Sequence, residues 1–289
     1  MTRQPSLRDI LQKTEAYLRE KNVDSPRLSA QLLLSKGLGI DRMGLFLNMD
    51  RPLGPAELDA LRPLVARRGR GEPAAYIIGE REFYSMAFEV TPDVLIPRPD
   101  TELIVEEALK LFGQDEELSF ADLGTGSGCL AICLAAKLPK SRGTALDLSP
   151  GALAVARRNA VRHGVAGRLS FVEGPFEELP AVPGGYGLIV SNPPYVSEAE
   201  YAELSPEVAG FEPRSALVPG ESGLEAYPVV AATARGALSP GGVLMLEIGW
   251  KQGPGIKRIL ESPGCGFQDV TVLADLAGHD RVVLGRMPR

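Results

Sequence analysis

Apolar residues in the first part of the chain recur at the three- and four-residue spacing of amphipathic helices. Four helices are expected there: residues 6–22 behind Ser6 as a candidate N-cap, a run from Ser25-Pro26 to Gly37-Leu38-Gly39, residues 41–48 and residues 55–68. The pattern predicts a small all-helical domain over residues 1–70.

The pattern changes after Glu72. Two short apolar runs, Tyr76-Ile77-Ile78 and residues 83–90, are punctuated by Gly79 and Pro92, as is typical of β-strands joined by turns. We therefore expect a β-hairpin linker over residues 71–97.

Strand-like and helix-like runs alternate in the remaining chain. A helix from Asp100 to about Phe112 is followed by seven apolar runs of strand length, at residues 118–123, 142–148, 169–173, 186–191, 242–249, 270–274 and 281–285. Strands that alternate with helices indicate a doubly wound parallel sheet. The last two runs leave no room for a helix between them, which predicts an antiparallel hairpin at the end of the sheet. Residues 98–289 are thus expected to form an α/β domain with a mostly parallel, seven-stranded, Rossmann-like sheet.

Composition is that of an ordinary soluble globular protein, because 44% of the 289 residues are apolar and 24% are charged. No apolar run reaches the roughly 18 residues that a membrane span needs, so we expect a cytoplasmic protein without a membrane partner. The three cysteines, Cys129, Cys133 and Cys265, are too few for a disulfide framework and suit core packing. With only two histidines in the sequence, no metal site is expected.

A glycine-rich turn joins the first predicted strand of the sheet to a helix. Glycines at alternate positions allow a tight turn in which backbone N–H groups approach a ligand at the helix N-terminus. Asp147 ends the next strand at the same sheet edge, where a carboxylate can accept hydrogen bonds from ribose hydroxyls. Cys129 stands where a dinucleotide fingerprint has its third glycine, which weakens a phosphate-binding interpretation. The sequence predicts a nucleoside pocket made by Asp147 and the turn residues Gly124, Thr125, Gly126, Ser127 and Gly128.

A second motif, Asn192-Pro193-Pro194-Tyr195, follows the predicted strand 186–191 at the same sheet edge. The two prolines restrict the backbone and make the loop stiff. The Asn192 side-chain carbonyl and the Pro193 backbone carbonyl can then accept both hydrogens of a planar NH2 group, while Tyr195 packs against its flat face. This arrangement suits a carboxamide or an exocyclic base amine that attacks a methyl group, with positioning and electrostatics in place of a strong base.

These motifs together resemble those of class I S-adenosylmethionine-dependent methyltransferases that act on a planar amine. Three further segments are similar to the HemK/PrmC family of release factor glutamine N5-methyltransferases: Arg-Glu-Phe-Tyr at 81–84, Leu-Ile-Pro-Arg-Pro-Asp-Thr-Glu at 95–102 and Phe-Glu-Pro-Arg-Ser-Ala-Leu at 211–217. The resemblance implies methyl transfer from S-adenosylmethionine to the side-chain amide nitrogen of the glutamine in the Gly-Gly-Gln motif of class I peptide chain release factors.

The resemblance also implies roles for single residues. Catalysis is assigned to Asn192, Pro193 and Tyr195. Substrate binding is assigned to the same three residues and Pro194. The cofactor is expected to contact Asn192, Asp147 and the turn at residues 124–128. After the third strand of the sheet the family often has an acidic residue and an aromatic pair, whereas this chain has Gly174-Pro175-Phe176. Pro175 and Phe176 are therefore the candidates for the adenine contact.

Four polar residues have no single predicted role. Asp122 is suited either to accept hydrogen bonds from a cationic amino-acid group or to brace the glycine turn. Arg98 and Glu102 are four residues apart, which fits a surface ion pair or part of a lid over the cofactor. Glu247, near the end of the fifth strand, has no assigned role.

Charge is distributed unevenly along the chain. Residues 1–75 contain 13 Lys and Arg against 9 Asp and Glu, a net charge of +4, and the remaining residues contain 18 against 28, a net charge of −10. This difference favours separate roles, with the basic segment as the contact for an acidic or nucleic-acid-containing partner, and an ordinary solvated surface explains it equally well. Docking of the release factor on the helical domain is a separate hypothesis, because a loop glutamine offers little binding area.

Two other functions fit the same motifs. The Asn192-Pro193-Pro194-Tyr195 loop would also suit a methyltransferase that acts on an exocyclic amine of DNA or RNA. The acidic charge of residues 76–289 argues against stable nucleic-acid binding. A noncatalytic cofactor-binding module is the second alternative.

Overall fold

In the computed structural model, which describes residues 4–289, seven strands pair into one sheet in the order β5-β4-β3-β6-β7-β9-β8. The strands are β3 (Ser119–Leu123), β4 (Arg142–Asp147), β5 (Leu169–Glu173), β6 (Tyr186–Ser191), β7 (Leu238–Glu247), β8 (Gln268–Ala274) and β9 (Asp280–Arg286). The first five are parallel, and β9 lies antiparallel between β7 and β8. The predicted seven-stranded sheet and its antiparallel C-terminal hairpin are both confirmed.

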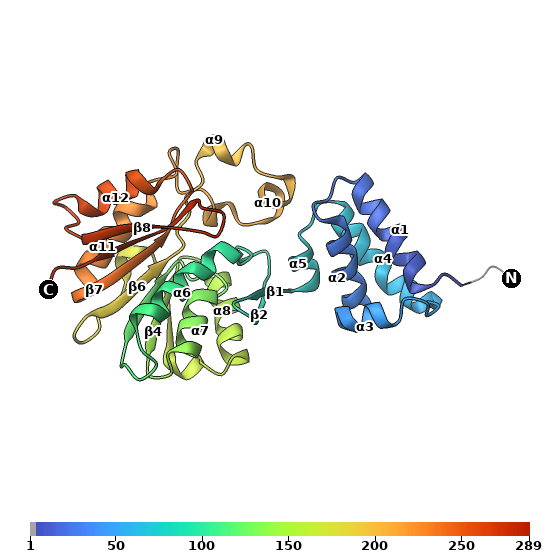
Figure 1. Ribbon diagram of the computed structural model, residues 1–289, viewed down its shortest axis with the longest axis horizontal. Helices are drawn as coiled ribbons and strands as arrows, with labels where there is room; N and C mark the ends of the chain where they lie inside the picture. Colours follow the sequence, from blue (N-terminus) through green and yellow to red (C-terminus); the bar gives the residue numbers. More distant parts are fainter. Residues whose placement is uncertain (1–3) are drawn as a thin grey trace. The chain divides into compact units, whose positions relative to one another are not determined.

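Helices cover both faces of this sheet (Figure 1). On one face lie α6 (Glu102–Leu111), α7 (Cys129–Lys137) and α8 (Pro150–Arg162), and on the other lie α11 (Ala226–Ala237) and α12 (Gly253–Glu261). Helix α7 is apolar on nearly every side because it is buried against the strands, and the Cys133 side chain is fully buried there. Cys133 therefore packs in the core, as predicted.

The carboxyl ends of the central strands meet at one edge. Leu123 of β3 pairs with Leu146 of β4 on one side and with Ser191 of β6 on the other. The chain moves outward from β3 to β4 and β5, then returns to β6 on the opposite side of β3. In open α/β sheets, ligands bind at the carboxyl edge where the strand order reverses, so this edge is the candidate site.

Short elements connect these layers. A separate two-stranded hairpin has β1 (Glu80–Phe83) and β2 (Met86–Glu89), and the short helix α9 (Glu198–Tyr201) follows the loop after β6. Single-turn 3-10 helices are η1 (Pro99–Thr101), η2 (Ala166–Arg168), η3 (Phe176–Glu178) and η4 (Arg214–Ala216).

The linker prediction is wrong for part of its length. Residues Tyr76-Ile77-Ile78 belong to a short helix, α5 (Ala74–Ile78), and not to a strand. Gly79 ends this helix with a φ of +79°, a left-handed conformation that glycine adopts without strain. Ile77 is buried among the apolar residues of the other N-terminal helices, so its burial stabilises the helical alternative.

The chain divides into two compact units, residues 1–80 with 205–211, and residues 81–204 with 212–289. The first unit consists of α1 (Leu7–Glu20), α2 (Pro26–Leu38), α3 (Arg42–Leu47), α4 (Pro55–Gly69), α5 and α10 (Pro206–Phe211). Ser6 caps α1 as predicted, because its Oγ accepts from the Asp9 backbone N–H at 3.2 Å. The domain limits at residues 70 and 97 stay predictions.

The inclusion of residues 205–211 in the helical unit was not predicted. Arg68 is only 3% exposed and forms an ion pair of 2.7 Å with Glu207 of α10. Its guanidinium also donates to Ser29 Oγ at 3.2 Å and to the Glu72 carbonyl at 2.9 Å. One buried arginine therefore connects α10 to the first unit.

Between residues 4 and 289, no helix is both long and apolar enough to cross a membrane.

Candidate active site

The glycine turn lies between β3 and α7, with φ angles of +75° at Gly124, +55° at Gly126 and +82° at Gly128. A Cβ atom on Gly128 would lie 2.9 Å from Cδ1 of Ile132 and 3.1 Å from Cβ of Ala156, so the left-handed φ and the close packing both favour glycine here. A Cβ atom on Gly126 would meet no atom within 4 Å. Gly126 therefore faces open space, where the backbone can approach a ligand.

Asp147 connects the end of β4 to this turn. One of its carboxylate oxygens accepts from the Gly126 backbone N–H at 2.8 Å and the other from the Ser149 backbone N–H at 2.9 Å. Burial raises the pKa of Asp147, and these backbone donors oppose the shift. Each oxygen has a second lone pair left for a further donor.

Asp122 is buried beneath the same turn. Its Oδ2 accepts from Thr125 Oγ1 at 2.6 Å and from the Ala131 backbone N–H at 3.1 Å. Its Oδ1 is equally buried and has no hydrogen-bond partner. Burial raises the pKa of Asp122 to about 7. Asp122 therefore braces the turn with one oxygen, and its other oxygen is unsatisfied. That this oxygen accepts from a cationic amino group stays a prediction.

Phe176 lies beside the turn, because its Cε1 atom would be 3.5 Å from a Cβ on Gly124. The neighbouring Gly174 backbone N–H donates to the Asp147 carbonyl at 3.1 Å. The sheet thus brings the predicted adenine segment and the turn together. That Pro175 and Phe176 bind adenine stays a prediction.

The Asn192-Pro193-Pro194-Tyr195 loop leaves β6 at the same edge, beside the strand that carries the turn. Asn192 Nδ2 donates to Thr101 Oγ1 at 3.3 Å, and the Tyr195 hydroxyl donates to Glu247 Oε1 at 3.2 Å. Gln252 Nε2 donates to the Tyr195 carbonyl at 3.0 Å, which fixes the backbone after the two prolines. The motif is therefore held by side chains from several elements.

Thr101 and Glu247 are buried polar residues at this edge that sequence reasoning did not assign. Thr101 lies at the end of η1, and Glu247 is the last residue of β7. Thr101 Oγ1 donates to Glu247 Oε2 at 2.5 Å, although the two residues are 146 positions apart. The signal available in the sequence was a carboxylate at the carboxyl end of a parallel strand.

Arg98 and Glu102 do not pair with each other. Arg98 donates to Glu212 Oε1 at 2.6 Å, and Glu102 accepts from the Tyr84 backbone N–H at 2.9 Å. Glu212 is buried and also accepts from the Ile96 backbone N–H at 3.0 Å. The ion-pair alternative is wrong, because Glu102, in the first turn of α6, accepts from the β1–β2 turn instead. The alternative in which the two residues form part of a lid over the cofactor stays a prediction.

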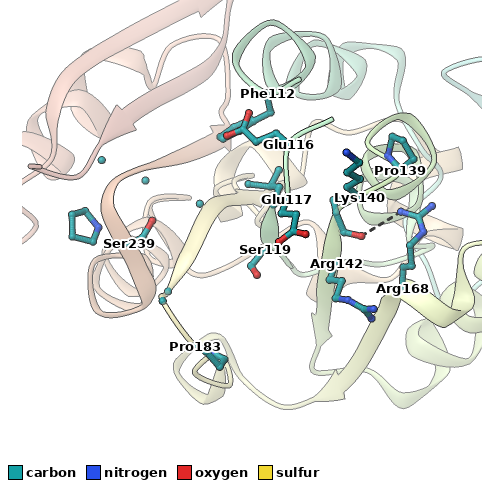
Figure 2. Close-up of a pocket in the computed structure, with 18 residues that line it drawn as sticks. Phe112, Glu116, Glu117, Ser119, Pro139, Lys140, Arg142, Arg168, Pro183 and Ser239 are labelled. Carbon is teal, nitrogen blue, oxygen red and sulfur yellow. Dashed lines mark hydrogen bonds between the residues drawn. The ribbon is translucent and has the colours of Figure 1, made fainter. Parts of the chain in front are cut away.

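A cavity of about 740 Å³ opens at the opposite edge of the sheet, around the amino ends of β3 and β4 (Figure 2). Its lining mixes the acidic Glu116 and Glu117 with the basic Lys140, Arg142 and Arg168. The strands of five or six residues between the two edges are roughly 15–20 Å long. This cavity is therefore separate from the glycine turn and Asn192.

Within residues 4–289, no group of three or more His, Cys, Asp or Glu side chains is arranged to hold a metal ion.

The N-terminal helical region and the sheet region both match known protein families. The family model for the PrmC N-terminal domain matches residues 9–79, and a methyltransferase domain model matches residues 120–210. The release factor glutamine methyltransferase of Geobacter sulfurreducens is 46% identical over 290 residues, which cover 99% of this chain and 100% of that protein. The chain belongs to the release factor glutamine methyltransferase family. The resemblance predicted from the motifs is thereby confirmed.

A second curated relative supports the family membership, and a solved structure shares the fold. The release factor glutamine methyltransferase of Nitratidesulfovibrio vulgaris is 45% identical and covers 99% of this chain and 96% of its own length. A crystal structure of a methyltransferase from Pyrococcus furiosus has a TM-score of 0.51 and 20% identity, and covers 71% of this chain and 91% of its own. The second likeness shows a shared fold. This member of the release factor glutamine methyltransferase family thus has the methyltransferase sheet.

Proposed function

We propose that the protein transfers a methyl group from S-adenosylmethionine to the side-chain amide nitrogen of the glutamine in the Gly-Gly-Gln motif of class I peptide chain release factors. The main support is the full-length identity of 46% to a release factor glutamine methyltransferase. The position of Asn192 beside the glycine turn agrees with this activity, because it brings a planar-amine acceptor and a cofactor pocket to one sheet edge.

The residues around the turn fit S-adenosylmethionine. The unsatisfied buried Oδ1 of Asp122 suits a cationic amino group, because a buried carboxylate oxygen without a partner is costly. Asp147 keeps lone pairs for ribose hydroxyls, and Phe176 offers an aromatic ring beside Gly124. When bound, the cofactor supplies an electrophilic methyl group.

The Asn192-Pro193 segment orients the glutamine amide. Asn192 Oδ1 and the Pro193 carbonyl accept its two hydrogens, and Pro194 and Tyr195 shape the slot around it. The nitrogen lone pair loses conjugation with the carbonyl during attack, and acceptors that are fixed in advance stabilise the positive charge that develops on the NH2 group. As the nitrogen–methyl bond forms, the sulfur–methyl bond breaks, S-adenosylhomocysteine leaves, and the nitrogen loses one of its two hydrogens to solvent as a proton. Positioning supplies the remaining acceleration.

The helical unit docks the release factor in this proposal. A single glutamine in a loop offers little contact area, so affinity must come from surfaces remote from the reacting atoms. The unit has a family model of its own and a positive net charge, in contrast to the acidic remainder of the chain.

The activity is tested by incubating the protein with labelled S-adenosylmethionine and a purified class I release factor. Parallel reactions contain a release factor with Gln→Ala in its Gly-Gly-Gln motif, tRNA or DNA, and an Asn192→Ala enzyme serves as the inactive control. Label is expected on the wild-type release factor alone. Label on tRNA or DNA would transfer the function to nucleic acid, and label on the Gln→Ala factor would exclude that glutamine.

A further inference from the structure

A chain of hydrogen bonds runs from the candidate catalytic loop to a buried carboxylate. Asn192 Nδ2 donates to Thr101 Oγ1 at 3.3 Å, and Thr101 Oγ1 donates to Glu247 Oε2 at 2.5 Å. The other oxygen of Glu247 accepts from the Tyr195 hydroxyl at 3.2 Å. Glu247 therefore contacts both ends of the motif, directly at Tyr195 and through Thr101 at Asn192.

Counting protons gives this chain a direction. An ionised carboxylate only accepts hydrogen bonds, and a threonine hydroxyl has one hydrogen to donate. Since Thr101 gives its hydrogen to Glu247, its oxygen can only accept from Asn192. The NH2 group of the Asn192 amide must then face Thr101, which leaves Asn192 Oδ1 free as an acceptor.

The groups around Glu247 act on the pKa of its carboxyl group in opposite directions. Its side chain is 1% exposed, and burial raises its pKa. The hydroxyl donors Thr101 and Tyr195 and the positive charge of Arg281 act against this shift, while the negative charge of Asp100 adds to it. Arg281 itself pairs with Asp100 at 3.3 Å and Asp275 at 3.1 Å, so its cationic side chain is fixed near the carboxylate.

We propose that Glu247 and Thr101 are positioning residues that fix the polarity of the Asn192 amide, so that an oxygen and not an NH2 group meets the NH2 group of the substrate. This inference rests on the proposed function for the identity of the substrate. Without the relay, the Asn192 amide can turn around and present a donor to a donor. The transition state would be destabilised most, because the substrate NH2 group becomes a stronger donor as positive charge develops on its nitrogen during attack on the methyl group.

Thr101 provides a matched pair of variants. Thr101→Ser keeps the hydroxyl relay, whereas Thr101→Val keeps the side-chain shape and removes the hydroxyl. We expect Thr101→Ser to retain kcat within about threefold and Thr101→Val to lose at least about thirtyfold in kcat, with the affinity for S-adenosylhomocysteine changed by less than about threefold in both. Thermal unfolding of each variant shows whether it is folded.

A second test uses Glu247→Met, which removes the acceptor. Freed from Glu247, the Thr101 hydroxyl can donate to Asn192 Oδ1 and turn the amide around. Adding Thr101→Val to Glu247→Met should therefore reduce kcat by no more than about threefold further, because both changes break one relay. Losses that multiply in the double variant would contradict the relay.

A readout independent of activity separates this inference from the proposed function. The Asn192 side-chain NH2 signals, assigned by their absence in Asn192→Ala, should exchange slowly with solvent in the wild type and in Thr101→Ser and faster in Thr101→Val. Equal exchange or equal kcat in Thr101→Ser and Thr101→Val would overturn the relay. A wild type that labels no release factor but keeps this exchange pattern would refute the proposed function alone.

Discussion

At the scale of single residues, Asp122 carries the most direct prediction about the cofactor. Its pKa is raised by burial to about 7, so the carboxyl is largely ionised above neutral pH and protonated below it. A cationic amino group at its unsatisfied oxygen would bind only the ionised form with full strength. Binding therefore favours loss of the proton, and the affinity must fall as the pH falls through about 7.

The corresponding measurement is calorimetric titration with S-adenosylhomocysteine. In the wild type, we expect the affinity to fall roughly tenfold from about one pH unit above the Asp122 pKa to about one unit below it. Asp122→Asn keeps an oxygen for Thr125 and Ala131 but removes the charge, so it should weaken binding about tenfold at the higher pH and show little of this pH dependence. An Asp122→Asn protein with wild-type affinity and the same pH profile would exclude the contact.

Residue types at fixed local spacing could be predicted from the sequence, but contacts between distant residues could not. The turn at residues 124–128 and the motif at residues 192–195 follow apolar strands, so their place at one edge follows from the periodicity. The contact of Thr101 with Glu247 depends on how β7 and η1 meet in three dimensions. No local pattern encodes that contact, and Glu247 alone looked like one carboxylate among many.

At the scale of elements, strands were easier to predict than short helices. The central strands β3 and β6 are apolar runs that the sheet buries on both faces, so burial and pattern agree there. Three apolar residues such as Tyr76-Ile77-Ile78 fit a strand and a buried helix equally well. In the structure the choice depends on Ile77 packing with the N-terminal helices, which a local pattern does not contain.

The sequence pattern also did not predict that α10 belongs to the helical unit. The contact that holds α10 there leads to a prediction about stability. Arg68→Met should destabilise the helical unit by roughly 2 kcal/mol, because it leaves Glu207 without its ion-pair partner. Hydrogen exchange should increase most in residues 205–211. Arg67→Met is the matched control, since the pair of Arg67 with Glu72 is more exposed than the pair of Arg68 and is worth about 1 kcal/mol. Equal protection of residues 205–211 in both variants would show that Arg68 does not anchor α10.

At the scale of the whole molecule, charge and surface differ between the two units. The basic residues dominate before residue 75, and the catalytic part is acidic. Helix α3 adds an apolar surface to the helical unit, because Met43, Phe46 and Leu47 are 65%, 44% and 77% exposed. Phe46 and Leu47 lie three and four positions after Met43, so both are its neighbours on the helix surface. Such a surface is suited to protein contact, which agrees with docking of the release factor.

Replacing Met43, Phe46 and Leu47 together with serine tests this role. We expect KM for the release factor to rise about tenfold, while kcat at saturation and the affinity for S-adenosylhomocysteine stay within about twofold, because remote contacts bind the ground state and transition state alike. Leu276→Ser is the control, since Leu276 is fully exposed in the second unit and should leave KM unchanged. Thermal unfolding should be little affected, because the replaced side chains are already exposed to solvent. An unchanged KM in the triple variant would remove α3 from the docking surface, and a matching loss of kcat would mean that α3 supports the reaction itself.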